Sequence, residues 1–128
     1  MSWLDSVSIN AMNKDLDGLW ARQQAISNNL ANVETPGYKA QTVSFEDQLQ
    51  AQLSNKSATE KETANNIKNI QPVTTESTDE TFRLDGNGVD LEAENVEMAR
   101  TQYNYMYTLR AMTDSFSRLK TVINGSGT

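Results

Sequence analysis

The chain contains no cysteine and no histidine. The first absence excludes disulfide bonds, a thiol nucleophile and a cysteine-ligated metal, and the second removes the commonest general base and the usual zinc ligand. The sequence also shows no glycine-rich phosphate loop, nucleophile elbow or spaced pair of acids that would suit a carboxylate-based hydrolase. We therefore predict no catalytic residue, no metal site and no cofactor, and we expect the protein not to be an enzyme.

Positive charge and long apolar runs are also scarce. Eleven Lys and Arg stand against seventeen Asp and Glu, which gives the 128 residues a net charge of -6. Without a clustered basic patch, the chain is a poor candidate for binding nucleic acid or an anionic membrane surface. No apolar run approaches the ~18 residues of a membrane span, and the first residues lack the features of a secretory signal. We expect no membrane span and no cleaved signal peptide.

What the chain does have is apolar periodicity. From residue 8 to residue 33 the apolar side chains recur at alternating spacings of three and four, which is the pattern of a heptad seam that faces a partner helix. Gln23 interrupts this seam, and it either fixes the register or contacts a different neighbour. The predicted seam residues of this first helix are Ile9, Met12, Leu16, Leu19, Ile26, Leu30 and Val33.

A longer helix with the same spacing is predicted from Leu91 to about residue 124, after a turn at residues 85–88. Asp90 is the natural N-cap of this helix, because its side chain can accept from the first free backbone N–H groups. At ~1.5 Å per residue the two helices are ~40 Å and ~50 Å long, so they can lie antiparallel along most of their length. The predicted seam residues of the second helix are Leu91, Met98, Tyr105, Leu109, Met112, Phe116, Leu119 and Ile123, with the polar Asn95 and Gln102 among them.

The part between the two helices is more polar. Residues 35–38 (Thr-Pro-Gly-Tyr) predict a type II turn, because glycine at the third position can adopt positive φ. Residues 43–53 predict a short and weaker amphipathic helix. From residue 54 to residue 81 few apolar side chains are available for burial, which predicts a linker or a segment that orders only on binding.

These patterns predict a mainly α fold. Its long N- and C-terminal heptad helices pair as an antiparallel coiled coil, and a short third helix and a disordered or poorly ordered middle complete it. We divide the chain into an N-terminal helix and turn (1–40), a short amphipathic helix (41–54), a polar flexible segment (55–84), and a turn with a long C-terminal helix (85–128). Because this seam is small relative to the cost of ordering the chain, we expect a monomer that is weakly ordered when isolated.

The most specific string in the chain is NLANVETPGY, residues 29–38. It resembles the signature of bacterial flagellar rod and hook proteins, in which Asn, Leu or Ile, Ala or Ser, Asn, any residue, and Asn or Asp precede Thr-Pro-Gly and an aromatic residue. Glu34 departs from this pattern, since the family usually has Asn or Asp there. The helix and turn of residues 85–123, and the lack of a large inserted domain, are similar to the proximal rod proteins of that family.

The resemblance implies a structural subunit of the flagellar basal-body rod, which is exported unfolded by the flagellar type III apparatus and polymerises as part of the motor drive shaft. The partners it implies are other rod subunits including FlgC, the adaptor FliE, the ring protein FliF and the export apparatus. A soluble coiled-coil adaptor or secretion chaperone is the alternative, because the heptads alone fit it equally well. The motif residues expected to make subunit contacts, partly through exposed amides, are Asn28, Asn29, Asn32, Thr35, Pro36, Gly37 and Tyr38.

Overall fold

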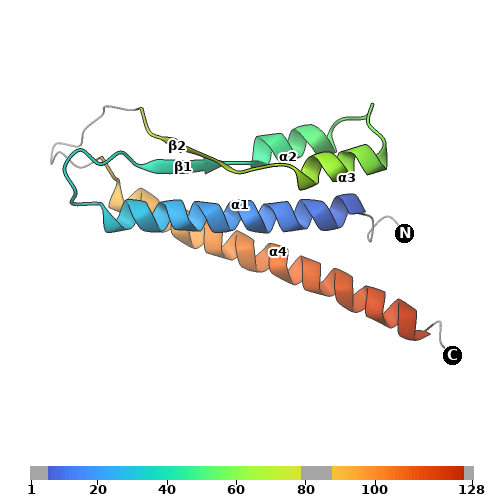
Figure 1. Cartoon of the computed structure of the whole chain (residues 1–128). Helices are drawn as coiled ribbons and strands as arrows, with labels where there is room; N and C mark the ends of the chain where they lie inside the picture. The colour runs from blue at the N-terminus through green and yellow to red at the C-terminus, as the bar shows by residue number, and fades with distance from the viewer. Residues whose placement is uncertain (1–5, 79–87, 126–128) are drawn as a thin grey trace.

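The computed structural model describes residues 6–78 and 88–125, which form a mainly helical molecule with long terminal helices, as predicted. Helix α1 lies between α4 on one side and a layer made of the two strands and two short helices on the other (Figure 1). None of the helices in these ranges is long and apolar enough to cross a membrane. The elements are α1 (Ser6–Ala31), β1 (Gln41–Ser44), α2 (Glu46–Leu53), α3 (Glu60–Lys68), β2 (Val73–Glu76) and α4 (Leu91–Gly125).

Helices α1 and α4 are antiparallel. Asn29 Nδ2, near the end of α1, donates to Glu94 Oε2 near the start of α4 at 3.0 Å. Asp15 Oδ2, in the first half of α1, accepts from Thr108 Oγ1 in the middle of α4 at 2.6 Å. The first half of α4 runs along α1, where Thr101 is buried, and its later turns diverge from α1 toward the C-terminus (Figure 1). The antiparallel pair of the sequence analysis is therefore formed, but the later turns of α4 lean away from α1.

The core lies between α1 and strand β1. Leu19 and Ala25 of α1 pack with Val43 and Phe45, which are 6% and 1% exposed. Gly18 allows this approach, because a Cβ at that position would overlap the Phe45 ring. A glycine inside a helix usually weakens it by about 1 kcal/mol, so this one is explained by packing. The sequence analysis did not identify its role.

Strand β1 stands where the sequence analysis placed the start of a helix. Val43 was expected in a helix to residue 53, yet it lies in the strand, and α2 begins only at Glu46. Strand β1 pairs antiparallel with β2 in a register that sets Gln41 opposite Glu76 and Ser44 opposite Val73. The alternation of buried Val43 and Phe45 with exposed Thr42 and Ser44 is the two-residue period of a strand.

Part of the segment expected to be a polar linker is regular. Helix α3 and strand β2 both fall within residues 55–84. A capping box starts α3, since Thr59 Oγ1 accepts from the Glu62 N–H at 3.2 Å and Glu62 Oε2 accepts from the Thr59 N–H at 2.8 Å. The helix then buries Ile67 completely and packs on α1, where Asn10 Nδ2 donates to the Ala64 carbonyl. The Thr-x-x-Glu pattern was a sequence signal for this helix that the analysis missed.

Two predicted local features are confirmed. Gly37 has a φ of 76°, and the Tyr38 N–H donates to the Thr35 carbonyl at 3.3 Å, as a type II turn requires. Asp90 Oδ1 accepts from the N–H groups of Glu92 and Ala93 at 3.1 and 3.2 Å, so Asp90 caps α4. Of the turn predicted at residues 85–88, only Gly88 falls within the described residues.

Candidate assembly surfaces

Asn29, in the last turns of α1, is fully buried and holds strand β1 against the helix. Its Nδ2 donates to the Gln41 carbonyl and its Oδ1 accepts from the Gln41 N–H, both at 2.8 Å. The Tyr38 hydroxyl also donates to this Oδ1, at 3.2 Å. The amide thus pairs with the edge of β1 that faces away from β2, much as a neighbouring strand would.

The prediction that the motif amides are exposed is therefore wrong for Asn29, because its side chain is buried and forms its hydrogen bonds within the chain. Asn32 is also engaged locally: its Nδ2 donates to the Asn28 carbonyl at 2.8 Å, and its Oδ1 accepts from Thr35 Oγ1 at 3.1 Å. The first bond gives the Asn28 carbonyl a second donor beside the Asn32 N–H, and the second bond joins the end of α1 to the turn. The Asn28 side chain is exposed, and a subunit contact there stays a prediction.

The turn of the motif projects from the molecule. Thr35, Pro36 and Gly37 are exposed, while Tyr38 is half-buried. A Cβ at Gly88 would overlap the Tyr38 carbonyl oxygen, so the approach to α4 runs directly against the turn. Burial, together with the nearby charges of Glu76 and Glu94, raises the pKa of the Tyr38 hydroxyl, which keeps it a donor to Asn29.

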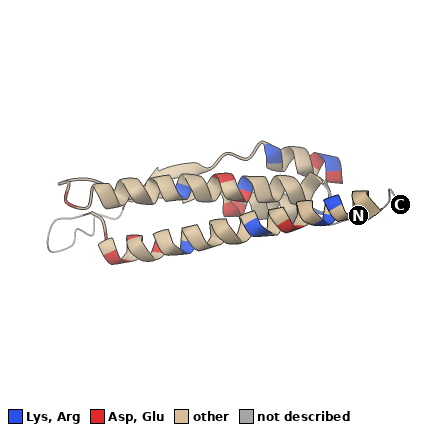
Figure 2. Cartoon of the chain, turned by 90° about the horizontal axis from the view of Figure 1, so that it is seen from below, with Lys and Arg blue, Asp and Glu red and all other residues tan. Residues whose placement is uncertain are grey.

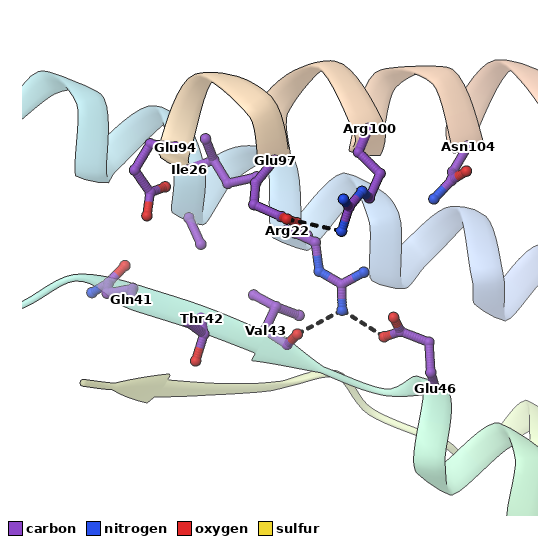
Figure 3. A pocket seen from close by; sticks show the side chains of 11 residues that line it. Arg22, Ile26, Gln41, Thr42, Val43, Glu46, Glu94, Glu97, Arg100 and Asn104 are labelled. Carbon is purple, nitrogen blue, oxygen red and sulfur yellow. Dashed lines mark hydrogen bonds and ion pairs between the residues drawn. The ribbon is translucent and has the colours of Figure 1, made fainter. Parts of the chain in front are cut away.

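Arg22 joins α1 to the layer above it. Its guanidinium donates to the Val43 carbonyl at 2.7 Å and to Glu46 Oε1 at 2.5 Å, and it lies 5.1 Å from the centre of the Phe45 ring. Figure 3 shows these contacts at the edge of a hollow of about 390 Å³ between β1 and α4, where Arg100 and Glu97 pair with each other. Arg22 and Arg100 both have carboxylate partners here, and Glu94, the third acidic residue of the lining, accepts from Asn29, so the hollow presents no unpaired cation to a ligand.

No group of acidic residues suited to a metal ion occurs within residues 6–78 and 88–125. Three of the four acidic residues of α4 lie instead in its first two turns, and the fourth, Asp114, lies among the basic residues further along (Figure 2). Glu92 and Glu94 lie in the first turn, where negative charge complements the helix dipole. This placement explains them as helix-stabilising residues.

The predicted seam of α1 lies against the rest of the molecule to different depths. Leu19 and Ile26 are buried, at 3% and 4% exposure. The other members are half-buried, and the last of them lies in the turn just after α1: Ile9, Met12, Leu16, Leu30 and Val33.

The predicted seam of α4 is divided. Met98, Tyr105, Met112 and Leu119 are half-buried, whereas the other members are exposed, with Leu109 at 47% and Phe116 at 48%. Within this chain the exposed members are therefore not covered by α1, and a seam using all eight residues is not formed. Leu109, Phe116 and Ile123 follow one another at seven-residue intervals on one edge of the seam, and we call these three residues the open half-seam. Leu91 is also exposed but lies on the other edge, seven residues before Met98.

Small polar residues of α4 lie against α1. Thr101 is only 2% exposed, Thr108 bonds to Asp15, and Ser115 follows at the same seven-residue interval. Short side chains let the two helices approach closely, so α4 is turned with these residues toward α1. The seven-residue repeat of Thr, Thr and Ser is visible in the sequence and could have indicated the face of α4 that packs on α1. A search for apolar periodicity does not detect it, because these residues are polar.

Known proteins resemble this chain in sequence. The family described as flagella basal body rod protein matches residues 18–39, which include the end of α1 and the turn. A flagellar basal body rod protein FlgB of Bacillus subtilis (strain 168) is 33% identical to this chain, and the match covers 81% of this chain and 83% of that protein. FlgB of Borreliella burgdorferi is 26% identical over 91% and 95% of the two chains, and FlgB of Escherichia coli (strain K12) is 27% identical over 80% and 82%.

The resemblance carried by residues 29–38 is thus confirmed over most of the chain. The relatives are structural rod proteins, which places the chain in the flagellar basal body and not among soluble adaptors or secretion chaperones. The chain belongs to the FlgB family of flagellar basal-body rod proteins, and it is a structural subunit of the rod.

Proposed function

We propose that the chain polymerises into the rod through α1 and α4, and that the open half-seam of α4 is completed by a helix of a neighbouring subunit. The observation that carries this proposal is the divided seam: Leu109 and Phe116 are about half exposed beside the half-buried Tyr105 and Met112. The apolar seam of α4 is wide enough to contact two helices, because α1 covers only one of its edges. Burial of each large apolar side chain stabilises the assembled state by up to about 1.5–3 kcal/mol.

The same surface supports a chain that completes its packing only on assembly. With the half-seam exposed, the isolated monomer is weakly ordered, and it is exported by the flagellar export apparatus in unfolded form without a cleaved signal peptide. Its neighbours are other rod subunits including FlgC, the adaptor FliE and the ring protein FliF. It carries out no reaction, and its contribution to the drive shaft is the stiffness of packed helices.

The test replaces a half-seam residue by a charge. Leu109→Asp is expected to abolish incorporation into basal bodies and swimming, because it places an unpaired carboxylate in the helix interface. Leu30→Asp, in the half-buried seam of α1, is expected to do the same. Ser117→Asp is the matched control, since Ser117 is exposed in α4 and lies outside the seam. Incorporation and motility are measured by immunoblots of purified basal bodies and by swim-ring diameter.

Either outcome is decisive for the use of this face. Motile cells that carry Leu109→Asp at normal protein levels would contradict the proposal. Circular dichroism with light scattering adds an independent test: the purified chain is expected to be a weakly helical monomer that gains helix with its rod partners. A fully helical, discrete oligomer without partners would contradict a chain that completes its packing only on assembly.

A further inference from the structure

A second exposed surface lies on the face of α4 that points away from α1. Tyr103 and Tyr107 are 75% and 73% exposed, and Met106 and Arg110 lie beside them around a shallow hollow of about 210 Å³. These four residues, which we call the outer ridge, lie about half a turn of the helix away from Thr101, Tyr105 and Thr108, which face α1. The outer ridge therefore faces away from α1 and consists of residues other than those of the open half-seam.

The composition of the outer ridge is that of an interface. Large aromatic side chains, Met and Arg are enriched where proteins bind each other, and contiguous exposed apolar groups of this kind mark binding surfaces. Among the described residues Arg110 forms no ion pair, so its charge is available to a partner. The partner surface should thus combine an aromatic or apolar recess with an accessible carboxylate.

A surface with those properties occurs on α1 of the same protein. Trp20 is 57% exposed and stands at the edge of a hollow of about 460 Å³ that Leu16, Pro72 and Tyr105 also line. Asp17, whose side chain is 64% exposed, lies one turn before Trp20 on the rim. Lys14 is mostly covered and lies 3.8 Å from Asp17, a weak contact that leaves this carboxylate open to a second cation. We call this surface the tryptophan hollow.

We propose that the outer ridge of one copy of this chain docks in the tryptophan hollow of the next copy, with Arg110 against Asp17. The inference rests on the proposed function, because it supplies a contact between successive subunits. The two surfaces lie on different helices and face different directions, so they cannot meet within one molecule. Two copies joined in this way leave one free ridge and one free hollow, which is a head-to-tail contact that can continue into a helical filament.

The contact is favourable in three ways. Tyr and Met side chains of the ridge bury apolar area against Trp20, and sulfur–aromatic contacts add to it. Opposite charges at Arg110 and Asp17 set the register and the direction of docking. The contact also explains why a tryptophan stands exposed on α1 although that helix is covered by α4 on one side and by α3 and β1 on another.

Engineered cysteines test the proposal sharply, because the natural chain has none. Copies carrying Asp17→Cys and copies carrying Arg110→Cys are made in the same cells, and basal bodies are treated with a short bis-maleimide. Cross-linked dimers are expected only when both variants are present. In the matched control, Ser27→Cys replaces Asp17→Cys, because Ser27 is also exposed on α1 but lies almost three turns further along. This pair is expected to remain monomeric.

Charge reversal gives a second readout. Asp17→Arg and Arg110→Asp are each expected to reduce the swim ring, and the two changes in one chain are expected to restore it. Dimers formed by either cysteine variant alone, or equal dimers from the control pair, would overturn the head-to-tail contact. Absence of cross-links in basal bodies that contain the chain would overturn it too, while the proposed function would stand. Absence of the wild-type chain from basal bodies would refute both.

Discussion

The Asn29 side chain forms the hydrogen bonds with β1 that a neighbouring strand would otherwise form. Its amide both donates to and accepts from Gln41, and it also bonds to Tyr38 and Glu94, so one side chain ties together α1, the turn, β1 and α4. A buried amide is tolerated only when its groups are paired, and every described bond here is within the chain. The first asparagine of the family motif in this chain is thus a residue of the fold.

Replacing Asn29 should show this. Asn29→Asp keeps the shape but removes the two N–H donors and brings a carboxylate close to Glu94. We expect the free energy of unfolding to fall by about 1–3 kcal/mol, because buried acceptors are left without donors. The measurement is the denaturant midpoint followed by circular dichroism. Asn28→Asp is the control, since its side chain is exposed, and a change within about 0.5 kcal/mol is expected there. Equal losses in both variants would contradict the role of Asn29.

At the scale of elements, α3 is a short helix that depends on its cap. It has nine residues, too few for an isolated helix to be stable in water, and it persists because Ile67 is buried against α1 and Thr59 closes its first turn. The fully exposed Glu62 completes the box, and its bonds to the backbone and side chain of Thr59 lower its pKa. Local capping and tertiary burial therefore act together on this element.

Thr59→Ala is expected to loosen α3 alone. Loss of the cap should cost about 1 kcal/mol, because the first backbone N–H groups lose their acceptor. Amide hydrogen exchange should become faster over residues 60–68 and stay unchanged in α1, since local opening does not require global unfolding. Lys61→Ala is the control, because Lys61 is exposed in the same turn and makes none of the capping bonds. Protection that is unaltered in α3 would show that burial alone holds it.

For the molecule as a whole, Arg22 links the helical pair to the layer of strands and short helices. Burial raises the pKa of Glu46, but the hydrogen bond and charge of Arg22 outweigh it, so the pKa lies below its ordinary value of 4.5. The folded state therefore favours the ionised carboxylate. Its contribution to stability is present above pH 4.5 and is lost as the pH falls through the lowered pKa.

Acid should accordingly weaken this link. We expect the melting temperature to fall as the pH drops below about 4.5, and Glu46→Gln to make that fall less steep, with the remainder due to groups such as Glu62. Thermal melts over a pH series measure both effects. Asp47→Asn, at the neighbouring exposed position, is the control and should keep the wild-type slope. An unchanged slope in Glu46→Gln would show that the Arg22 contact adds nothing measurable.

The amino-acid sequence alone predicts the two long helices, the type II turn at residues 35–38, the Asp90 cap and the family. Each of these depends on residues close together in the chain, where periodicity, proline, glycine and capping side chains act directly. The sequence analysis did not predict β1, β2 or α3, because β1 and α3 gain their stability from contacts with the distant helix α1, and β2 gains its stability by pairing with β1.

Which edge of the apolar seam of α4 faces α1 depends on packing between the two helices, and it is visible in the tertiary structure alone. Periodicity shows that Tyr105, Leu109, Met112 and Phe116 share one side of a helix, but it does not rank its two edges. Close packing determines which edge is buried, because Thr101, Thr108 and Ser115 are small enough for α1 to approach, whereas larger side chains would keep the two helices apart. The same packing buries Asn29, which the motif suggested was exposed, and leaves Leu109 and Phe116 exposed for a neighbouring subunit.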